Sequence, residues 1–336
     1  MSAAQCALLA LTLAVSPLAA YAQAEWYTEL EVARDSALAT GKPIFLDAYT
    51  TWCAPCKQMD KEVFAEPTTM TLLHAMFVPL KLDMESPGAA RLKQQYDIGV
   101  FPTLLVFDEA GEMHRAVGYQ SERDLYAFAT LSTDDDRNFR GKRWRYLRGE
   151  RTDTLLSQLA AYAKTVQHRD YPRYAYDWLV ASGEWDTDAG RHRLLDAVPD
   201  VDHPLFDTLI ARRTGFDEQF GAYVVDERIA RLLETALYGE QAATPREAKR
   251  VLAKAYPTRA DSTYLRHRMR VAREAGKAKR YGKLALKWQK RWPTDDPDEL
   301  AELLYVFESR LEGWKTNTVA AWRSREEELR AASEDF

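Results

Sequence analysis

The stretch Thr51–Met59, TWCAPCKQM, holds two cysteines three positions apart, Cys53 and Cys56, with Ala54-Pro55 between them. Two thiols at this spacing can act as a redox centre, can supply half of a metal site, or can close a structural disulfide. The residues around the pair decide among these three readings. They also decide the fold.

The composition describes a globular protein with no excess of positive charge. The chain has 336 residues, of which 46% are apolar and 29% are charged, and its formal net charge is −5. This length is enough for two domains of ordinary size. Proteins that bind nucleic acids in general carry a basic surplus, so we expect no nucleic acid among the partners.

The first 24 residues have the features of a secretory signal peptide. An apolar run, Ala7–Val15, is followed by the small-x-small pattern Ala20-Tyr21-Ala22, which is typical of a cleavage site. Cleavage would remove Cys6 and leave the pair above as the only cysteines of a periplasmic or secreted protein. The run is shorter than the ~20 apolar residues that a spanning helix needs. We therefore expect no stable membrane insertion after cleavage, with an uncleaved anchor as the alternative.

Strand and helix patterns alternate over residues 25–131. Short apolar runs predict strands at 44–49, 77–82, 103–107 and 112–117. Helical spacing predicts helices at 26–40, from the cysteines to about 65, at 88–96 and at 122–131. The tight turn at 108–111 joins the last two strands as an antiparallel pair. This order predicts an α/β sheet domain.

The rest of the chain has a different pattern. Residues 132–138 are polar and acidic, as expected of a linker. Residues 139–336 repeat apolar positions at helical spacing between glycine and proline breaks, and contain no convincing strand pattern. We expect an all-helical domain here. A repeat-like arrangement remains open, because no clean repeat period is found.

The expected helix start gives the two cysteines different chemistry. A thiolate, not a thiol, attacks a disulfide. Cys53 would lie at a helix N-terminus, where free N–H groups and the helix dipole favour negative charge. It is therefore the expected nucleophile, and Cys56, one turn further on, is the expected resolving thiol. Pro55 fits the first helical turn, where a missing N–H costs little.

Two other readings of the pair have less support. A structural zinc site needs four ligands, and no second pair of closely spaced cysteines exists. His74 or His114 could contribute a ligand, but neither pairs with another candidate at ligand spacing. A purely structural disulfide would close a very small loop, so chain entropy would contribute little stability.

Several further motifs, in the right order, make residues 26–131 resemble the thioredoxin superfamily. Asp47 precedes Cys53 by six positions, and Trp52 and Lys57 flank the cysteine motif. The segment Tyr96–Leu104, YDIGVFPTL, is similar to the Y-x-I-x-x-x-P-T-L segment of the family. The run WCAPCKQMDKEVF at 52–64 is most similar to the extracytoplasmic branch that includes the C-terminal domain of the thiol reductase DsbD.

The resemblance implies roles for further residues. Asp47 would be a buried acid with a raised pKa that takes a proton from the resolving thiol through a water. Pro102, after a cis bond to Phe101, would offer backbone groups to an extended substrate. Trp52 would shield the thiols and present an apolar surface, and Gly118 would let a partner backbone approach.

Simpler readings stay open at three of these positions. Asp47 could be a strand-end residue satisfied by local hydrogen bonds, Pro102 a trans loop proline and Gly118 an ordinary turn residue. Lys81 could tune the site electrostatically, but an ordinary strand lysine is the favoured interpretation.

These features together predict a periplasmic or secreted thiol–disulfide oxidoreductase. Cys53, Cys56 and Asp47 would carry the reaction, with no metal and no cofactor. The substrates would be protein thiols or disulfides, and an electron-donating thiol reductase would be a partner. The Ala-Pro pair resembles the Gly-Pro of reducing thioredoxins and favours disulfide reduction. The alternatives are a disulfide oxidase or isomerase, and a non-catalytic helical scaffold with a redox-sensing domain.

Overall fold

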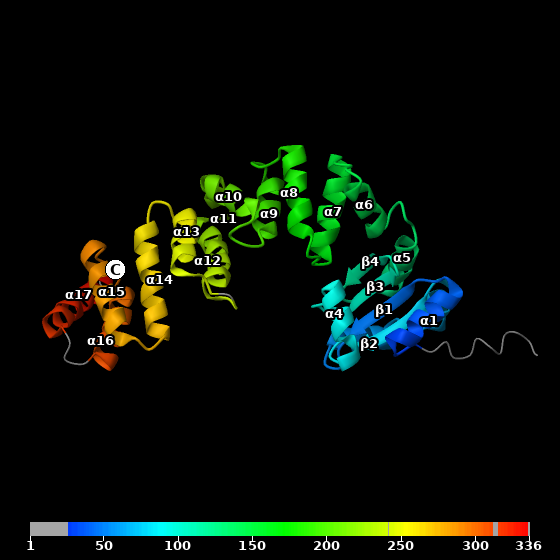
Figure 1. Ribbon diagram of the computed structural model, residues 1–336, viewed down its shortest axis with the longest axis horizontal. Coiled ribbons are helices and arrows are strands. Elements are labelled where there is room, and N and C mark those ends of the chain that lie inside the picture. The colour runs from blue at the N-terminus through cyan, green and yellow to red at the C-terminus, as the bar shows by residue number, and fades with distance from the viewer. Residues whose placement is uncertain (1–25, 241, 312–314, 335–336) are drawn as a thin grey trace, which may run out of the picture. The chain divides into compact units, whose positions relative to one another are not determined.

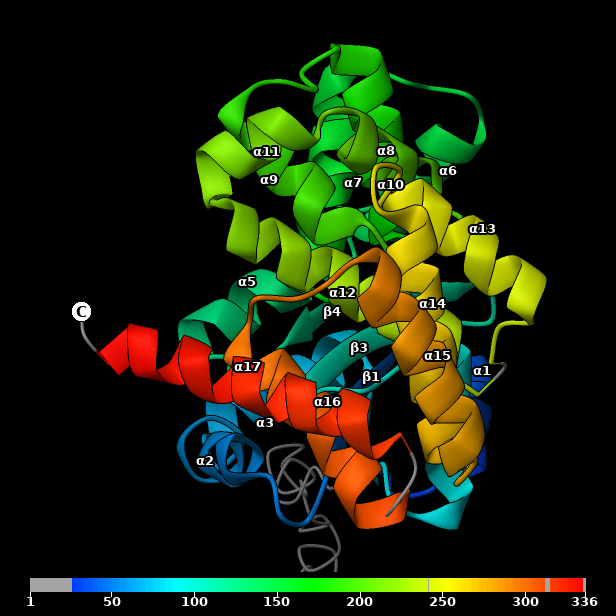
Figure 2. The same ribbon diagram turned by 90° about the vertical axis from the view of Figure 1, so that its left-hand side faces the viewer.

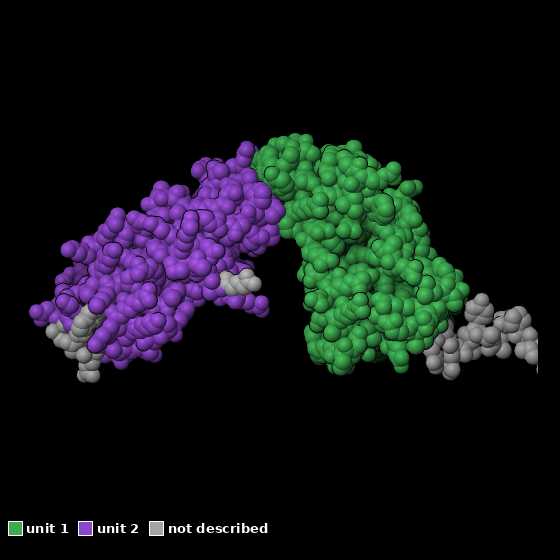
Figure 3. Space-filling model, viewed as in Figure 1, with its two compact units in different colours: residues 1–185 green, residues 186–336 purple. Residues whose placement is uncertain are grey.

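The computed structural model describes residues 26–240, 242–311 and 315–334. The predicted signal peptide lies outside the described residues. The chain divides into two compact units, residues 1–185 and 186–336, which Figure 3 shows in different colours.

The first unit is built on a four-stranded mixed sheet in the order β2-β1-β3-β4. Strand β1 pairs parallel to β2 and antiparallel to β3, and β3 pairs antiparallel to β4. The strands are β1 (Ile44–Tyr49), β2 (Val78–Asp83), β3 (Thr103–Asp108) and β4 (Gly111–Val117). All four predicted strands are confirmed, each to within one residue at either end.

Helices cover both faces of this sheet, as Figures 1 and 2 show. Successive residues of a strand point to opposite faces, so the apolar runs of the central strands supply two cores. One face is covered by α1 (Leu30–Thr40) and α4 (Ala90–Tyr96), the latter preceded by a short 3₁₀ turn, η2 (Pro87–Ala89). The other face is covered by α2 (Ala54–Glu62), α3 (Pro67–Met76) and α5 (Glu122–Ser132).

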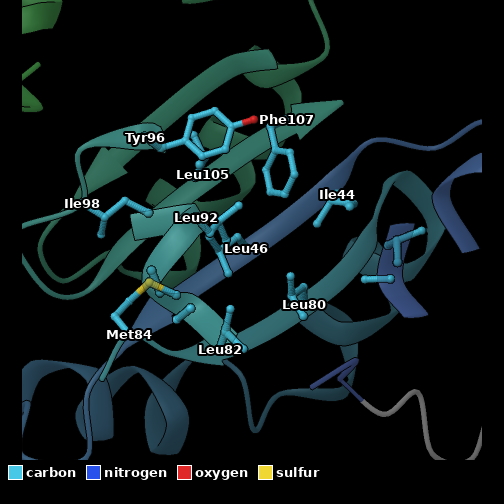
Figure 4. Close-up of a cluster of buried hydrophobic side chains, with 14 residues drawn as sticks. Ile44, Leu46, Leu80, Leu82, Met84, Leu92, Tyr96, Ile98, Leu105 and Phe107 are labelled. Atoms are coloured by element: carbon cyan, nitrogen blue, oxygen red, sulfur yellow. The ribbon is translucent and has the colours of Figure 1, made fainter. Parts of the chain in front are cut away.

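Figure 4 shows the core on the first of these faces. Ile44 and Leu46 of β1 pack there with Leu80 of β2 and Leu105 of β3, and Leu92 of α4 closes the cluster. These strand residues are almost completely buried. The core fixes the central strands and leaves the ends of the strands free to carry other chemistry.

Two helix predictions need correction. The helix expected from residue 26 begins only at Leu30, because Tyr27 instead extends the sheet: its N–H donates to Pro79 O at 2.9 Å and its C=O accepts from Lys81 N at 2.8 Å. The helix expected to run to about residue 65 ends at Glu62, and the unpredicted α3 follows at Pro67. Proline is well suited to a first helical turn because it lacks a donor.

Three further helices belong to the first unit. They are α6 (Phe139–Leu147), α7 (Asp153–Thr165) and α8 (Tyr171–Ser182). The segment expected to be a linker is an ordered turn between α5 and α6. Asn138 holds it, donating from Nδ2 to Ser132 O at 3.0 Å and accepting at Oδ1 from Gly141 N at 2.8 Å. Helix α6 packs against β4, and α7 packs against both α6 and α8.

Helix α7 caps the outer edge of β4. The Tyr162 hydroxyl accepts from Arg115 N at 2.6 Å and donates to Arg115 O at 3.1 Å. The Tyr162 ring stacks on His114 and on Phe139, each with ring centroids 4.7 Å apart. An edge strand leaves backbone groups without partners, and here one side chain satisfies a donor and an acceptor together.

The second unit is helical over its described residues. Its elements are α9 (Asp188–Ala197), α10 (Pro204–Ala211), α11 (Arg213–Phe220), α12 (Ala222–Tyr238), α13 (Pro245–Ala255), α14 (Ala260–Glu274), α15 (Ala278–Arg291), α16 (Pro297–Arg310) and α17 (Thr316–Glu334). Consecutive helices pack on each other, and a separate core joins α14, α15 and α16 around Trp288 and Phe307. The predicted α/β domain followed by helices is confirmed. Over the described ranges, no helix combines the length and the apolar character needed to cross a bilayer.

The contact between Tyr162 and β4 yields a stability prediction. In Tyr162→Phe, the buried N–H and C=O of Arg115 lose their shared partner, which should weaken this edge by about 1–3 kcal/mol. Amide hydrogen exchange of β4 measures the loss. Tyr223→Phe is the matched control, because Tyr223 is 79% exposed. Equal exchange in the two variants would show that the hydroxyl contributes nothing.

Candidate active site

The cysteine pair lies where β1 passes into α2. Cys53 and Cys56 are joined in a disulfide, and Cys53 is the N-cap of α2. Its Sγ accepts a hydrogen bond from Cys56 N at 3.2 Å, while its own N–H donates to Thr50 O at 3.1 Å. Free N–H groups at a helix N-terminus stabilise negative charge. This geometry favours a thiolate on Cys53 once the disulfide is reduced.

The register of the sheet brings a second loop to the same end. Ala48, near the end of β1, is paired with Thr103, the first residue of β3. The Phe101–Pro102 bond just before it is cis, as the resemblance implies. Gly118 follows β4 and donates from its N–H to Pro102 O at 2.8 Å. Three chain segments therefore meet at one end of the sheet.

Gly118 has a backbone that suits close approach by another chain. Its φ is +85°, a conformation that residues with a side chain rarely adopt, and a Cβ added there would meet nothing within 4 Å. The glycine is therefore required by the backbone conformation, and open space lies above it.

Trp52 forms the exposed part of the site. Its side chain is 64% exposed, whereas Cys53 and Cys56 are buried. The indole N–H donates to Glu85 Oε1 at 2.8 Å, and the ring meets Phe101 edge-on with centroids 6.1 Å apart. Trp52 is therefore an exposed aromatic side chain that is held in place beside the buried cysteines.

A charge network around the buried Asp47 lies on the face of the sheet covered by α2. Asp47 and Lys81 are partners in the β1–β2 register, and Lys81 Nζ donates to Asp47 Oδ2 at 2.8 Å. The same ammonium donates to the Asp60 carboxylate. Asp60 follows Cys56 by four positions, and residues at this spacing share a helix face. Lys81 therefore connects Asp47 of β1 to α2, the helix that carries Cys56.

Burial sets the protonation behaviour of this network. The loss of solvation raises the pKa of Asp47, and the ammonium beside it limits the rise. For Lys81, burial opposes the charged form, but the carboxylates of Asp47 and Asp60 prevail and raise its pKa. A carboxyl group with a raised pKa is better matched to accepting a thiol proton near neutral pH.

The histidines named above as metal-ligand candidates lie elsewhere in the fold. His114 in β4 stacks on Phe128 and Tyr162, and Phe139 N donates to its Nδ1 at 3.3 Å. Burial lowers the pKa of His114 to about 4, and Lys142 acts in the same direction. His74 lies in α3. Within residues 26–240, 242–311 and 315–334, no three His, Cys, Asp or Glu side chains form a group that could hold a metal ion.

Sequence reasoning missed part of this site. Lys81 is opposite Asp47 in the observed register, whereas the predicted strands 44–49 and 77–82, aligned from their first residues, would set Leu80 there instead. Asp60 was overlooked, although its spacing from Cys56 is visible in the sequence. Nothing in the sequence indicates that Glu85 or Tyr119 lies beside the cysteine pair. Tyr119 follows Gly118, and its hydroxyl donates to Glu62 Oε2 at 2.9 Å.

The sheet domain is similar to known proteins of thiol–disulfide exchange. Residues 30–130 match the family described as a thioredoxin-like domain. The thiol:disulfide interchange protein DsbD of Pseudomonas fluorescens is 32% identical over 101 residues, and that of Escherichia coli K12 is 38% identical over 95 residues. These matches cover 30% and 26% of this chain but only 17% and 16% of the relatives.

Two solved structures match the same part of the chain. A putative disulphide-isomerase from Bacteroides thetaiotaomicron is 31% identical, with 34% of this chain and 98% of that chain covered and a TM-score of 0.30. The DsbD C-terminal domain of Neisseria meningitidis is 21% identical, with 32% and 98% covered and a TM-score of 0.27.

The cysteine pair at the start of α2 and the match over residues 30–130 agree with each other. Together they support a redox-active disulfide in a thioredoxin-like domain. Residues 30–130 therefore form a thioredoxin-like domain that is similar to the DsbD proteins, and its Cys53–Cys56 disulfide supports thiol–disulfide oxidoreductase chemistry.

Proposed function

We propose that this protein is a periplasmic or secreted reductase of protein disulfides, and that Cys53 and Cys56 are its working dithiol. One observation carries the proposal. Cys53 caps α2 at the end of the sheet where the cis Phe101–Pro102 bond and Gly118 also lie.

The proposed reaction passes two electrons from the dithiol to the substrate. The Cys53 thiolate attacks one sulfur of a substrate disulfide, forms a mixed disulfide and releases the first substrate thiolate. The Cys56 thiolate then attacks Cys53 Sγ, which releases the second substrate thiolate and closes the Cys53–Cys56 disulfide. Both substrate sulfurs are reduced and both enzyme sulfurs are oxidised.

Asp47 is the proposed proton acceptor for the second step. Cys56 must lose its proton to attack, and Asp47 lies buried on the sheet face that α2 covers. Its raised pKa suits proton transfer through a water. In this proposal, Lys81 and Asp60 set the charge around that transfer.

Trp52, Phe101, Pro102 and Gly118 are the proposed docking surface. An extended substrate segment would pair with the backbone at Phe101, as chains do when they add to exposed backbone groups. The open space at Gly118 would admit that backbone, and the exposed Trp52 ring would supply apolar contact.

The proposal also includes the location of the protein outside the cytoplasm and the direction of electron flow toward the substrate. The signal-like residues 1–24 support export, and the Ala54-Pro55 pair supports the reducing direction. In an oxidising compartment, each turnover leaves the enzyme as a disulfide. The proposal therefore includes a partner thiol reductase that supplies two electrons to restore the dithiol.

Cysteine variants test the proposed roles directly. Cys53→Ser should abolish the acceleration of insulin reduction by dithiothreitol that the wild-type protein gives, because the nucleophilic thiol at the start of α2 is lost. Cys56→Ser should instead accumulate mixed disulfides, visible as a mass increase that thiols reverse. Insulin reduction by Cys53→Ser at the wild-type rate would contradict the assignment.

Asp47→Asn tests the proton acceptor. Burial raises the pKa of Asp47, so its ionised fraction grows as the pH rises through that value. The wild-type rate of mixed-disulfide resolution should rise over the same range and then level off.

The variant should lack this rise and resolve roughly 100-fold more slowly. Stopped-flow release of the second substrate thiol measures the rate, and the exposed acid variant Asp35→Asn is the matched control. A pH profile that Asp47→Asn leaves unchanged would exclude Asp47 from the step.

A further inference from the structure

A row of positive charge runs along α15 in the second unit. Residues 277–291 contain seven lysines and arginines and no aspartate or glutamate, although the whole chain has a net charge of −5. Lys279, Lys283, Lys287 and Lys290 are exposed and repeat at intervals of four, four and three positions, which places them on one helix face. We call these four residues the lysine row. At 1.5 Å per residue, it is about 16 Å long.

The lysine row has no partner within the part of the chain that the structure describes. No ion pair or side-chain hydrogen bond joins any of its four lysines to a described residue, and the same holds for Lys277 and Arg280 beside them. The seventh cation, Arg291, lies 3.6 Å from a carboxylate oxygen of Asp261. Six positive charges therefore stand together without a counter-charge from the described chain.

The carboxylates that could neutralise the lysine row are already paired. Helices α14 and α16 pack against α15 (Figure 2) and together carry six acidic residues, each in an ion pair with an arginine. The pairs are Asp261–Arg291, Glu274–Arg270, Asp298–Arg330, Glu299–Arg266, Glu302–Arg273 and Glu308–Arg323. In the turn after α15, Asp295 pairs with Arg325, and Asp296 accepts from two backbone N–H groups as the N-cap of α16. Compensation for the row must come from outside the unit.

The apolar face of α15 is already used inside the second unit. Tyr281, Leu284, Ala285 and Trp288 are buried in the core that α15 shares with α14 and α16. An amphipathic helix that lies in a membrane interface buries such a face among the lipids. Helix α15 cannot do this without breaking its core, so its outer face acts through charge alone.

The composition of this outer face favours a lipid surface over a protein partner. Every exposed residue of α15 is a lysine or an arginine. Protein interfaces are enriched in aromatic residues and depleted in lysine, and no aromatic side chain is exposed on this helix. Clusters of about four to eight lysines and arginines are instead typical of attraction to anionic lipid headgroups, which present many charges in one plane.

We propose that the lysine row of α15 holds this protein against an anionic phospholipid surface. The ammonium groups meet the lipid phosphates, and the helix backbone stays outside the bilayer. The contact is reversible and sensitive to salt, because the screening length falls from about 10 Å at 0.1 M salt to about 3 Å at 1 M. The inference goes beyond the proposed reductase and does not depend on the thiol chemistry of the first unit.

Sedimentation with lipid vesicles tests the proposal. The protein is used without residues 1–24, because the apolar run in that segment could itself enter a bilayer. One set of vesicles is phosphatidylcholine alone, and the other contains equal parts of phosphatidylcholine and phosphatidylglycerol. The wild-type protein should sediment with the mixed vesicles only. This binding should disappear when sodium chloride is raised from about 0.1 M to about 1 M.

A pair of double variants assigns the binding to α15. Lys283→Gln with Lys287→Gln removes two charges from the lysine row and introduces residues that suit a helix. Its affinity for the mixed vesicles should fall roughly 30-fold, the effect of two cations near an anionic surface. Arg246→Gln with Lys249→Gln is the matched control, because it removes the same charge from exposed positions of α13. It should bind like the wild type, and both double variants should reduce insulin at the wild-type rate.

The possible outcomes separate lipid from protein and the lysine row from the reductase. No wild-type binding to the mixed vesicles at low salt, or equal losses in the two double variants, would overturn the proposal. Poly-glutamate, at the same concentration of negative charge, is the competing probe. If it bound the lysine row more tightly than the mixed vesicles do, the partner would be an acidic protein and not a lipid. Insulin reduction is measured separately, so failure of either proposal is seen independently of the other.

Discussion

The pairing of β1 with both of its neighbours determines where the chemistry of this protein lies. Its antiparallel register with β3 sets Ala48 opposite Thr103, which brings the cysteine turn and the cis-proline loop to one end of the sheet. Its parallel register with β2 sets Asp47 opposite Lys81 beneath α2. A shift of β1 by one residue would turn Asp47 to the face of the sheet opposite Lys81. The two apolar cores prevent such a shift, because each requires alternate residues of β1.

The helical extension is partly integral to the sheet domain. Helices α6 and α7 pack on β4, and the Tyr162 hydroxyl satisfies the edge backbone at Arg115. This contact protects an edge strand from pairing with other chains. It also places Val166 and Gln167, just beyond the end of α7, beside the loop before the cis bond. The same packing that stabilises the fold thus shapes the surroundings of the disulfide.

Local sequence patterns predict much of the sheet domain and of the candidate site. The four strands, the helix start at Cys53 and the cis-proline motif all depend on neighbouring residues, and each was predicted. The features that the sequence did not predict depend on contacts between residues far apart in the chain. Tyr162 and Arg115 are 47 positions apart, and nothing near either one indicates the other. Helix α3 was missed because its short apolar run follows α2 closely, with only Pro67 as its start signal.

The reduction potential of the Cys53–Cys56 couple tests the central claim most directly. It is measured by equilibration with dithiothreitol in a Cys6→Ser chain, so that only this pair titrates. A reductase of protein disulfides requires a potential near about −270 mV, the value typical of thioredoxin. A potential near about −120 mV would make the disulfide a strong oxidant and would contradict the proposed direction of electron flow.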